Sequence, residues 1–339
     1  MAVPNISEGR SQAAIEAIAG AFSGSGKARL LDVHSDSDHD RSVYTLAGLP
    51  GALAGALLDG ARETVALVDV VAGAGGGTAP AAATQGEGEG GGDDGRAIAG
   101  AVRFGSARAR ANAPIERISG QHPRVGALDV APIVYLDEAA RGAAIAEALV
   151  LADRIGEELS IPVFLYGELA GGRTRAQLRS GGVAGLARRL ESGELRPDFG
   201  PARLHPSAGA TLVAAREPLI AFNVQLAPSA TLADARAIAA LIREGGAEGL
   251  PGVRAIGVEL AATGGAPPAA QVSMNVERPL ELPLATVLGH VRAHAQVVSA
   301  EIVGLAPEVA LEGFPPDVPI VGFDPERQLY ERALDSLGA

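Results

Sequence analysis

The sequence predicts an α+β fold in which two split βαβ subdomains enclose a cleft. Apolar and polar residues alternate in several short stretches, and longer stretches between them carry apolar residues at i, i+3, i+4 and i+7. In the second half these stretches follow one another as strand, helix, strand, strand, helix, strand, and the first half shows a less regular version of this order. With 339 residues, of which 47% are hydrophobic, the chain can bury more than one core.

The second subdomain, 216–339, has the clearest periodicity. Its expected elements are a strand over 220–226, a helix over 231–243, strands over 256–260 and 272–276, a helix around 284–291 and a strand over 302–305. The helix around 284–291 places Leu284, Val287 and Leu288 on one face. This order defines a ferredoxin-like unit, in which two helices pack on one face of an antiparallel sheet.

The first subdomain, 1–170, is expected to form the other unit. Its elements are a short strand near Val3, a helix over about 11–22, strands over 30–33 and 42–47, a helix over about 52–68, a strand over 127–135, a helix over about 138–159 and a strand over 163–166. A connection, 171–215, joins the two subdomains. We therefore expect the ligand site in the cleft between them.

Residues 71–116 interrupt this pattern. The stretch 71–100 holds 11 glycines together with Glu87, Glu89, Asp93 and Asp94, and it has no hydrophobic periodicity. Such a composition is typical of a flexible, acidic insertion. Two interpretations stay open, a passive surface loop or a lid, since the insertion leads towards His122.

Composition narrows the class of partner. A net charge of −12 argues against nucleic acid, and an anionic small molecule would need a local basic pocket. The absence of cysteine excludes disulfides and thiolate metal sites. The start of the chain has no signal-peptide pattern, and no apolar run approaches the length of about 18 residues needed for a membrane span. We therefore expect a cytoplasmic protein.

Three polar motifs each allow a structural and a functional interpretation. Residues 23–27 resemble part of a phosphate loop but lack its first glycine and its final Ser or Thr, so a helix-ending turn is favoured. The stretch 34–40 fits a solvated loop best, and otherwise a pocket-lining loop or a metal site. His290 and His294 are four residues apart on a helix, which provides at most half of a zinc site, so surface histidines are favoured and we expect no metal.

His122 is the strongest candidate for a catalytic residue. Pro123 disfavours a helical conformation at His122, and Gly126 permits a close approach to the following strand. A histidine on such a rigid loop, beside Arg124, is suited to proton transfer near neutral pH. From the residues alone, a structural histidine explains the pattern equally well.

Several stretches, in order along nearly the whole chain, resemble the glutamate formiminotransferase (formimidoyltransferase) family. They are 3–10 (VPNISEGR), 30–33 with 40–43, 122–130 (HPRVGALDV), 163–168 (VFLYGE), 197–201 with 205–211, 219–224, 270–275 and 302–305. Each match is weak alone, whereas the occurrence of all of them in this order is specific to the family.

This resemblance implies a folate-binding transferase that moves the formimino group of N-formimino-L-glutamate to tetrahydrofolate in histidine degradation, with His122 as the proton-transfer residue. It also implies a homodimer, tetrahydrofolate as co-substrate, and a separate cyclodeaminase acting downstream. The residues that lie in or beside matched motifs, and that the resemblance places near the substrates, are Asn5, Arg10, His34, Arg41, Arg124, Gly200, Pro201, Arg203, His205, Ser207 and Gly209.

Two departures from the family pattern leave alternatives open. Residues 118–121 stand where the family has a charged, glycine-containing run before the histidine, and His34 stands where animal members often have Asp. A formylglutamate-using tetrahydrofolate formyltransferase and a non-catalytic folate-binding homologue are therefore the alternatives.

Overall fold

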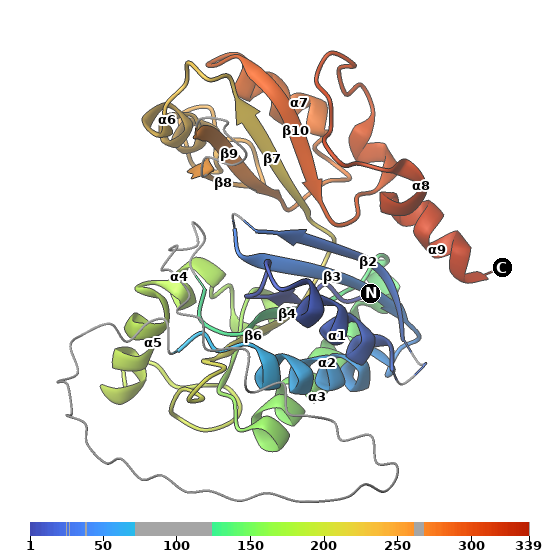
Figure 1. The fold of residues 1–339 in the computed structure, drawn as a ribbon, viewed down its shortest axis with the longest axis vertical. Coiled ribbons are helices and arrows are strands. Elements are labelled where there is room, and N and C mark those ends of the chain that lie inside the picture. Colours follow the sequence, from blue (N-terminus) through green and yellow to red (C-terminus); the bar gives the residue numbers. More distant parts are fainter. Residues whose placement is uncertain (25, 27, 38, 72–123, 261–267, 339) are drawn as a thin grey trace, which may run out of the picture.

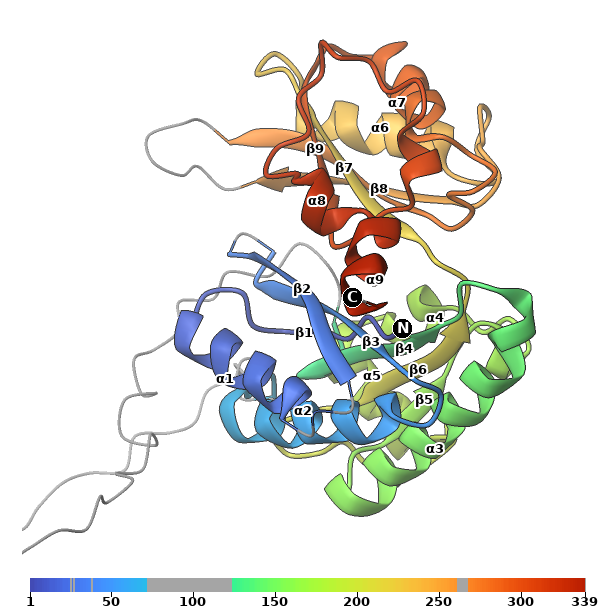
Figure 2. The same ribbon diagram turned by 90° about the vertical axis from the view of Figure 1, so that its right-hand side faces the viewer.

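The computed structural model describes residues 1–339 except 25, 27, 38, 72–123, 261–267 and 339. The described part forms two β-sheets, one from each half of the chain, whose outer faces are covered by helices (Figures 1 and 2). The expected insertion at 71–116, apart from Val71, and the candidate catalytic residue His122 lie outside the described residues. None of the helices in the described part has the length and apolar character needed to cross a bilayer.

The first half contains a six-stranded sheet. Its elements are β1 (Asn5–Ile6), α1 (Gln12–Ser23), β2 (Ala28–Asp36), β3 (Arg41–Gly48), α2 (Leu53–Leu67), β4 (Leu128–Val134), η2 (Glu138–Ala140), α3 (Arg141–Leu159), β5 (Val163–Leu165), η3 (Glu168–Ala170), α4 (Arg175–Arg179), α5 (Gly182–Glu191) and β6 (Thr211–Arg216). The strand order is β2-β3-β1-β4-β6-β5. Strand β6 lies in the stretch that the sequence predicts to be a connection.

This sheet differs from the antiparallel sheet of the split βαβ unit expected for the first half. Strand β6 pairs in parallel with β4 on one side and β5 on the other, while the remaining pairs are antiparallel. Parallel neighbours need long crossover connections. Helix α3 connects β4 to β5, and helices α4 and α5 connect β5 to β6. In the sheet, β6 lies between β4 and β5.

The second half contains a four-stranded antiparallel sheet in the order β10-β7-β9-β8. Its elements are β7 (Ile220–Leu226), α6 (Leu232–Ile242), β8 (Val253–Leu260), β9 (Ala269–Val276), α7 (Leu284–Arg292) and β10 (Val297–Val303), followed by η4 (Glu308–Leu311), α8 (Pro325–Gln328) and α9 (Tyr330–Gly338). From β7 to β10 the succession is the strand, helix, strand, strand, helix, strand order expected from the sequence.

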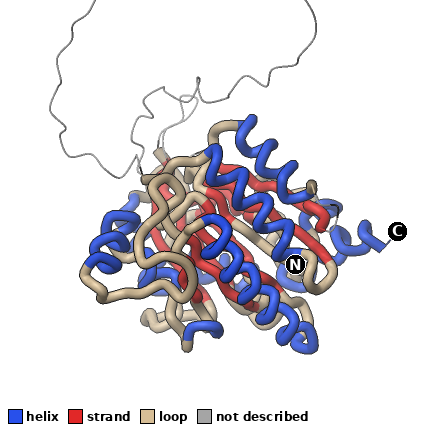
Figure 3. Tube along the Cα trace, turned by 90° about the horizontal axis from the view of Figure 1, so that it is seen from below, coloured by secondary structure: helices blue, strands red, loops and turns tan. Residues whose placement is uncertain are grey.

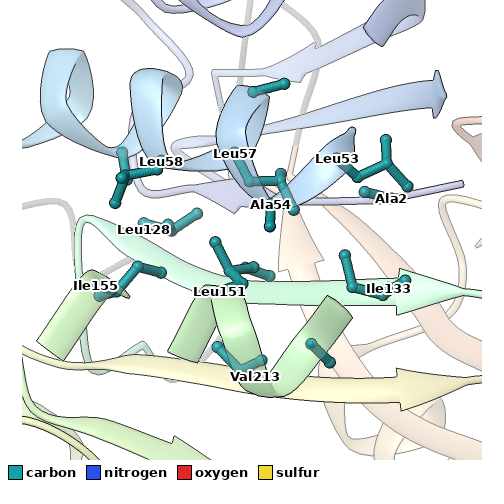
Figure 4. Close-up of a cluster of buried hydrophobic side chains, with 14 of the residues drawn as sticks. Ala2, Leu53, Ala54, Leu57, Leu58, Leu128, Ile133, Leu151, Ile155 and Val213 are labelled. Atoms are coloured by element: carbon teal, nitrogen blue, oxygen red, sulfur yellow. The ribbon is translucent and has the colours of Figure 1, made fainter. Parts of the chain in front are cut away.

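Each sheet has an apolar face that packs on helices, and in the first sheet Val130, Phe164 and Leu212 on the other face form a further core with residues of α4 and α5. In the first half Leu57 of α2, Leu128 of β4 and Leu151 of α3 are almost completely buried between helices and sheet (Figure 4). Seen from below, helices cover the strands of this sheet (Figure 3). In the second half Phe222 of β7 packs in a core with residues of α6 and α7. Burying one such side chain contributes about 1.5–3 kcal/mol, so these faces hold each layer together.

The opposite faces of the two sheets carry polar residues although they are also buried. These residues are Thr45, Asp129, Asn223, Gln271, Ser273 and Ser299. Contacts such as that between His34 of β2 and Glu301 of β10 show that these faces look towards each other. Because burial of polar groups is unfavourable without partners, a polar layer between two sheets indicates a place for a polar ligand.

Gly126 approaches the segment just before β6, rather than the following strand that the sequence predicted, and this contact gives a stability prediction. A Cβ on Gly126 would lie 1.7 Å from the carbonyl oxygen of Ala210, whereas a Cβ on Gly142, in the first turn of α3, would meet no atom within 4 Å. We expect Gly126→Ala to lower the free energy of unfolding by about 1–3 kcal/mol or more, as overpacking does. Gly142→Ala should raise it by about 0.5–1 kcal/mol, since alanine favours helix. Urea denaturation of both variants checks this, and equal shifts would contradict it.

Candidate active site

A cavity of about 600 Å³ opens between the two sheets. The first half contributes residues at the carboxyl ends of β5 and β6, where parallel sheets commonly bind ligands. The second half contributes residues of β8 and β9. The cavity lining includes Tyr166, Arg175, Arg179, Arg216, Ser273 and Asn275.

The lining of this cavity is strongly basic. Six arginines line it, Arg173, Arg175, Arg179, Arg216, Arg243 and Arg254, against three acids, Glu217, Glu244 and Glu277. The chain as a whole carries a net charge of −12. The cavity therefore provides the local positive field that an anionic ligand requires on an acidic protein.

A buried carboxylate organises the arginines beside the cavity. Asp129 is fully buried, and its Oδ2 accepts hydrogen bonds from Arg179 and, at 3.5 Å, from Arg41. Burial lowers the pKa of Arg41 to about 10; the charge of Asp129 opposes this, while the neighbouring charges of Arg179, Arg124 and Arg175 add to it. The guanidiniums are thus close enough to repel one another.

Arg175 belongs to the same group and carries a second set of contacts. Its guanidinium lies 5.7 Å from the centre of the Tyr166 ring and 3.8 Å from the carboxylate of Glu277. Burial lowers the pKa of Arg175, and the charges of Arg179 and Arg216 lower it further. The stacking on Tyr166 holds a planar cation at the wall of the cavity.

Four buried polar atoms, at this cavity or at a smaller one beside it, have no hydrogen-bond partner among the described residues. They are Oγ1 of Thr45, the hydroxyl of Tyr166, Nε of Arg179 and Nε of Arg216. A buried donor without a partner costs about 1–3 kcal/mol, so such atoms are expected to meet a ligand or water. Thr45 and Arg216 line a smaller cavity of about 50 Å³, which shares Arg175, Arg216, Leu219 and Asn275 with the larger one.

A different group of titratable residues joins the two sheets at the β2–β10 side. The Nε2 of His34 lies 3.3 Å from Oε1 of Glu301, and Asn223 donates a 2.9 Å hydrogen bond to the other oxygen. Burial alone would lower the pKa of His34, but the hydrogen bond and charge of Glu301, with Asp32 and Asp36, raise it above its ordinary value. This contact therefore favours a charged imidazolium between the two halves.

The raised pKa of His34 predicts a pH dependence of stability. A histidine with a raised folded-state pKa stabilises the fold fully below its ordinary pKa of 6.5, and this contribution disappears as the pH rises through the raised value. We expect the difference in melting temperature between the parent and His34→Gln to shrink from pH 6 to pH 9. Thermal melts over this range check the prediction. The matched control is His294→Gln, which removes a different His–Glu pair, that of His294 with Glu248. A difference that grows with pH would contradict the prediction.

Three of the predicted binding residues surround the β2–β3 turn. Asp40 adopts a left-handed conformation with φ of 49°, and its carboxylate lies 3.2 Å from Arg124 and 3.8 Å from Arg10. Arg41 follows directly and contacts Asp129. Asn5 lines the smaller cavity, while its Nδ2 donates to the carbonyl of Val3. The structure therefore gathers Arg10, Arg41 and Arg124 near one turn, with Asn5 beyond it.

The predicted segment 200–209 is placed elsewhere. None of Gly200, Pro201, Arg203, His205, Ser207 and Gly209 is in the lining of the two cavities. Gly200 packs against Ile161 and Gly156, and Gly209 packs against Val125. The Nδ1 of His205 accepts the backbone N–H of Ala208 at 3.0 Å, and burial lowers the pKa of His205. In the described part of the chain, these residues stabilise a loop at the amino ends of β4 and β6, and the predicted substrate contact stays a prediction.

Sequence reasoning missed the principal lining residues of the large cavity. Arg175 and Arg179 lie at i, i+4 on α4, Tyr166 follows β5 and Arg216 ends β6. The i, i+4 pair of arginines in the stretch RTRAQLR was a usable signal, but the stretch fell in the expected connection. Glu301 stands directly before the matched stretch 302–305, but no motif in the sequence marked it as a candidate site residue.

The remaining motifs have structural explanations. Helix α1 ends at Ser23 with Gly24 as its C-cap, which agrees with a helix-ending turn at 23–27. His290 and His294 both lie near Glu248, at 3.9 and 2.8 Å. Within the described residues, no group of three or more His, Cys, Asp or Glu is arranged to hold a metal. The expectation that no metal is needed stays a prediction.

Comparisons with known proteins agree on one family. The model of the formiminotransferase domain, N-terminal subdomain, matches residues 1–77 and 92–216, and the gap falls in the glycine-rich stretch. The chain is 31% identical to the glutamate formimidoyltransferase of Streptococcus pyogenes serotype M1 over 91% of this chain and 89% of that protein. It is 29% identical to the glutamate formimidoyltransferase of Thermoplasma acidophilum over 98% of this chain and 96% of that protein.

Longer relatives share the same region. The formimidoyltransferase-cyclodeaminase of Rattus norvegicus is 33% identical over 91% of this chain, and the chain spans about half of its length. The proteins of that name from Sus scrofa and Gallus gallus give the same identity and coverage.

Proposed function

Because this chain belongs to the formiminotransferase family, we propose that it transfers the formimino group from N-formimino-L-glutamate to tetrahydrofolate, giving 5-formiminotetrahydrofolate and L-glutamate, as in histidine degradation. The observation that supports this best is the arginine-lined cavity between the two sheets. Both substrates carry carboxylates, and the planar guanidinium of arginine matches a carboxylate with two parallel hydrogen bonds.

The cavity also suits the size and shape of the substrates. Its volume of about 600 Å³ lies in the range typical of small-molecule sites. Tyr166 and Arg175 provide a flat wall for a ring system, and the unpartnered nitrogens of Arg179 and Arg216 provide donors for anionic groups. Holding two substrates in one cavity would supply much of the rate by proximity alone.

The reaction itself needs one proton to be moved between two nitrogens. The N5 of the folate attacks the formimino carbon and loses its proton, the bond from that carbon to the glutamate nitrogen breaks, and this nitrogen takes up a proton. One imidazole can carry out both transfers. We assign this role to His122, which stands two residues before Arg124, the arginine held by Asp40.

The proposal includes two points that rest on the resemblance alone. These are a homodimer and a separate cyclodeaminase that acts on the product, and the proposal further includes the cytoplasmic location expected from the sequence. Light scattering of the purified protein tests the first. Conversion of the product by an added cyclodeaminase tests the second, and fractionation of cells that express the protein tests the location.

An assay of the purified protein with tetrahydrofolate and each of two donors tests the proposed reaction. We expect turnover with N-formimino-L-glutamate to exceed turnover with N-formyl-L-glutamate. The opposite preference would identify a formyltransferase. Folate binding without turnover of either donor would identify a non-catalytic homologue. Either of these two results would reject the proposal.

A further inference from the structure

Asp129 is the extra residue of a β-bulge in strand β4. Along the β1–β4 pair, Asn5 stands opposite Val130 and Ile6 stands opposite Leu128, so that Asp129 has no partner in the ladder. Ala131 and Ile133 both lie in the core between sheet and helices. Strict alternation would aim Asp129 into that apolar core as well. The bulge instead directs its side chain to the opposite face of the sheet, where it meets the arginines.

The carboxylate of Asp129 uses both oxygens on this face. Its Oδ1 accepts the backbone N–H of Val125 at 2.8 Å, and its Oδ2 accepts from Arg179 and Arg41. It is fully buried, while the side chains of Arg41 and Arg179 are only 18% and 12% exposed.

The charges of this group do not cancel. Asp129 meets two guanidiniums, Arg124 has Asp40 as its partner, and Arg175 has Glu277. Four cations therefore face three carboxylates. Arg179 lines the large cavity, and its Nε has no partner among the described residues. Asp129 thus brings Arg41 beside Arg179, which lines the cavity, and leaves the positive charge of these two cations only partly compensated.

We infer that Asp129 is a positioning residue that holds Arg41 and Arg179 in the arrangement which binds a substrate carboxylate. The identity of that carboxylate, on folate or on the glutamate donor, rests on the proposed function. Asp129 itself does not contact the ligand. Its role is to keep the guanidinium planes in place, because a bidentate contact depends on their orientation.

The substitution Asp129→Asn separates positioning from simple charge balance, since the two roles predict effects of opposite sign. Asparagine keeps an acceptor for Val125 N–H but removes the negative charge, which makes the site more positive. If Asp129 only balanced charge, anion binding would become tighter. If it positions the arginines, binding should become at least about tenfold weaker, a change of about 1.4 kcal/mol.

The measurement is the dissociation constant of tetrahydrofolate and of L-glutamate by calorimetry, with the folded state checked by circular dichroism. Asp317→Asn, which removes an exposed carboxylate from its pair with Arg292, is the matched control. We expect at least one ligand to bind about tenfold more weakly to Asp129→Asn and equally well to the control. Unchanged or tighter binding of both ligands to a folded Asp129→Asn would overturn the inference, as would a parent protein that binds neither.

A second variant covers the case in which Asp129→Asn fails to fold. Arg41→Lys keeps the positive charge but loses the planar, bidentate donor. It is expected to bind one of the two ligands about tenfold more weakly, and binding equal to the parent would overturn the inference. These dissociation constants do not depend on turnover. A parent that binds the ligands but transfers no formimino group would reject the proposed function and leave the role of Asp129 intact.

Discussion

His122→Ala is expected to lower kcat by about 100-fold or more while the protein stays folded, because loss of an acid–base group commonly costs 10²–10⁴ in rate. The residue stands in the HPRVGALDV stretch, which carries the resemblance to the formiminotransferase family. With both substrates at saturation, binding contributes little to the measured rate, so the loss should be confined to kcat. Steady-state kinetics and a thermal melt of the variant measure the two expectations separately.

The control for this variant is His294→Ala. His294 lies on the exposed side of the second half and pairs with Glu248, away from both cavities. It should turn over at the parental rate. Added imidazole should restore part of the activity of His122→Ala if a proton carrier is what the variant lacks. Activity within a few-fold of the parent would remove His122 from the mechanism.

Arg179→Met is expected to affect stability and substrate binding together. It leaves the buried carboxylate of Asp129 with Arg41 as its remaining cationic partner, and removal of one partner from a buried ion pair costs about 3–5 kcal/mol. It also removes a guanidinium from the cavity lining, so KM for a carboxylate substrate should rise more than about tenfold. Denaturation in urea and steady-state kinetics give the two values.

Arg154→Met provides the comparison for this second variant. Arg154 pairs with Glu158 on the exposed surface of α3, and solvent screening leaves such exposed pairs with little effect on stability. Its stability and KM should stay close to those of the parent. An Arg179→Met protein that loses stability but keeps the parental KM would show that the arginine supports the fold without binding substrate.

The second half shows how much of the fold could be predicted. The expected strand over 220–226 and helix over 231–243 correspond to β7 and α6, which begin and end within one residue of these bounds. Helix α6 begins with a capping box of Thr231 and Asp234, a signal that is complete within four residues of sequence. Such elements are predictable because their apolar faces, caps and turns are local features of the chain.

The first half shows where prediction stops. The expected strand over 163–166 corresponds to β5, whereas β6 lies in a stretch rich in small residues that reads as a connection. Strand β6 is buried on both faces, so it lacks the alternation that marks a half-exposed strand. Its parallel pairing with β4 and β5 depends on where the helices return the chain, which is a property of the packed layers.

The amino-acid sequence by itself determined the α+β class, the order of elements in the second half, the family, and the candidates His122, Arg41 and Arg124. The tertiary structure alone decided that Arg41, Arg179 and Asp129 share one ion cluster and that His34 meets Glu301 across 267 residues of chain. The physical reason is the distance along the chain between the residues that interact. Periodicity and capping arise between residues a few positions apart, whereas a cluster of like charges around one buried carboxylate exists only once two sheets have packed and a bulge has turned Asp129 towards them.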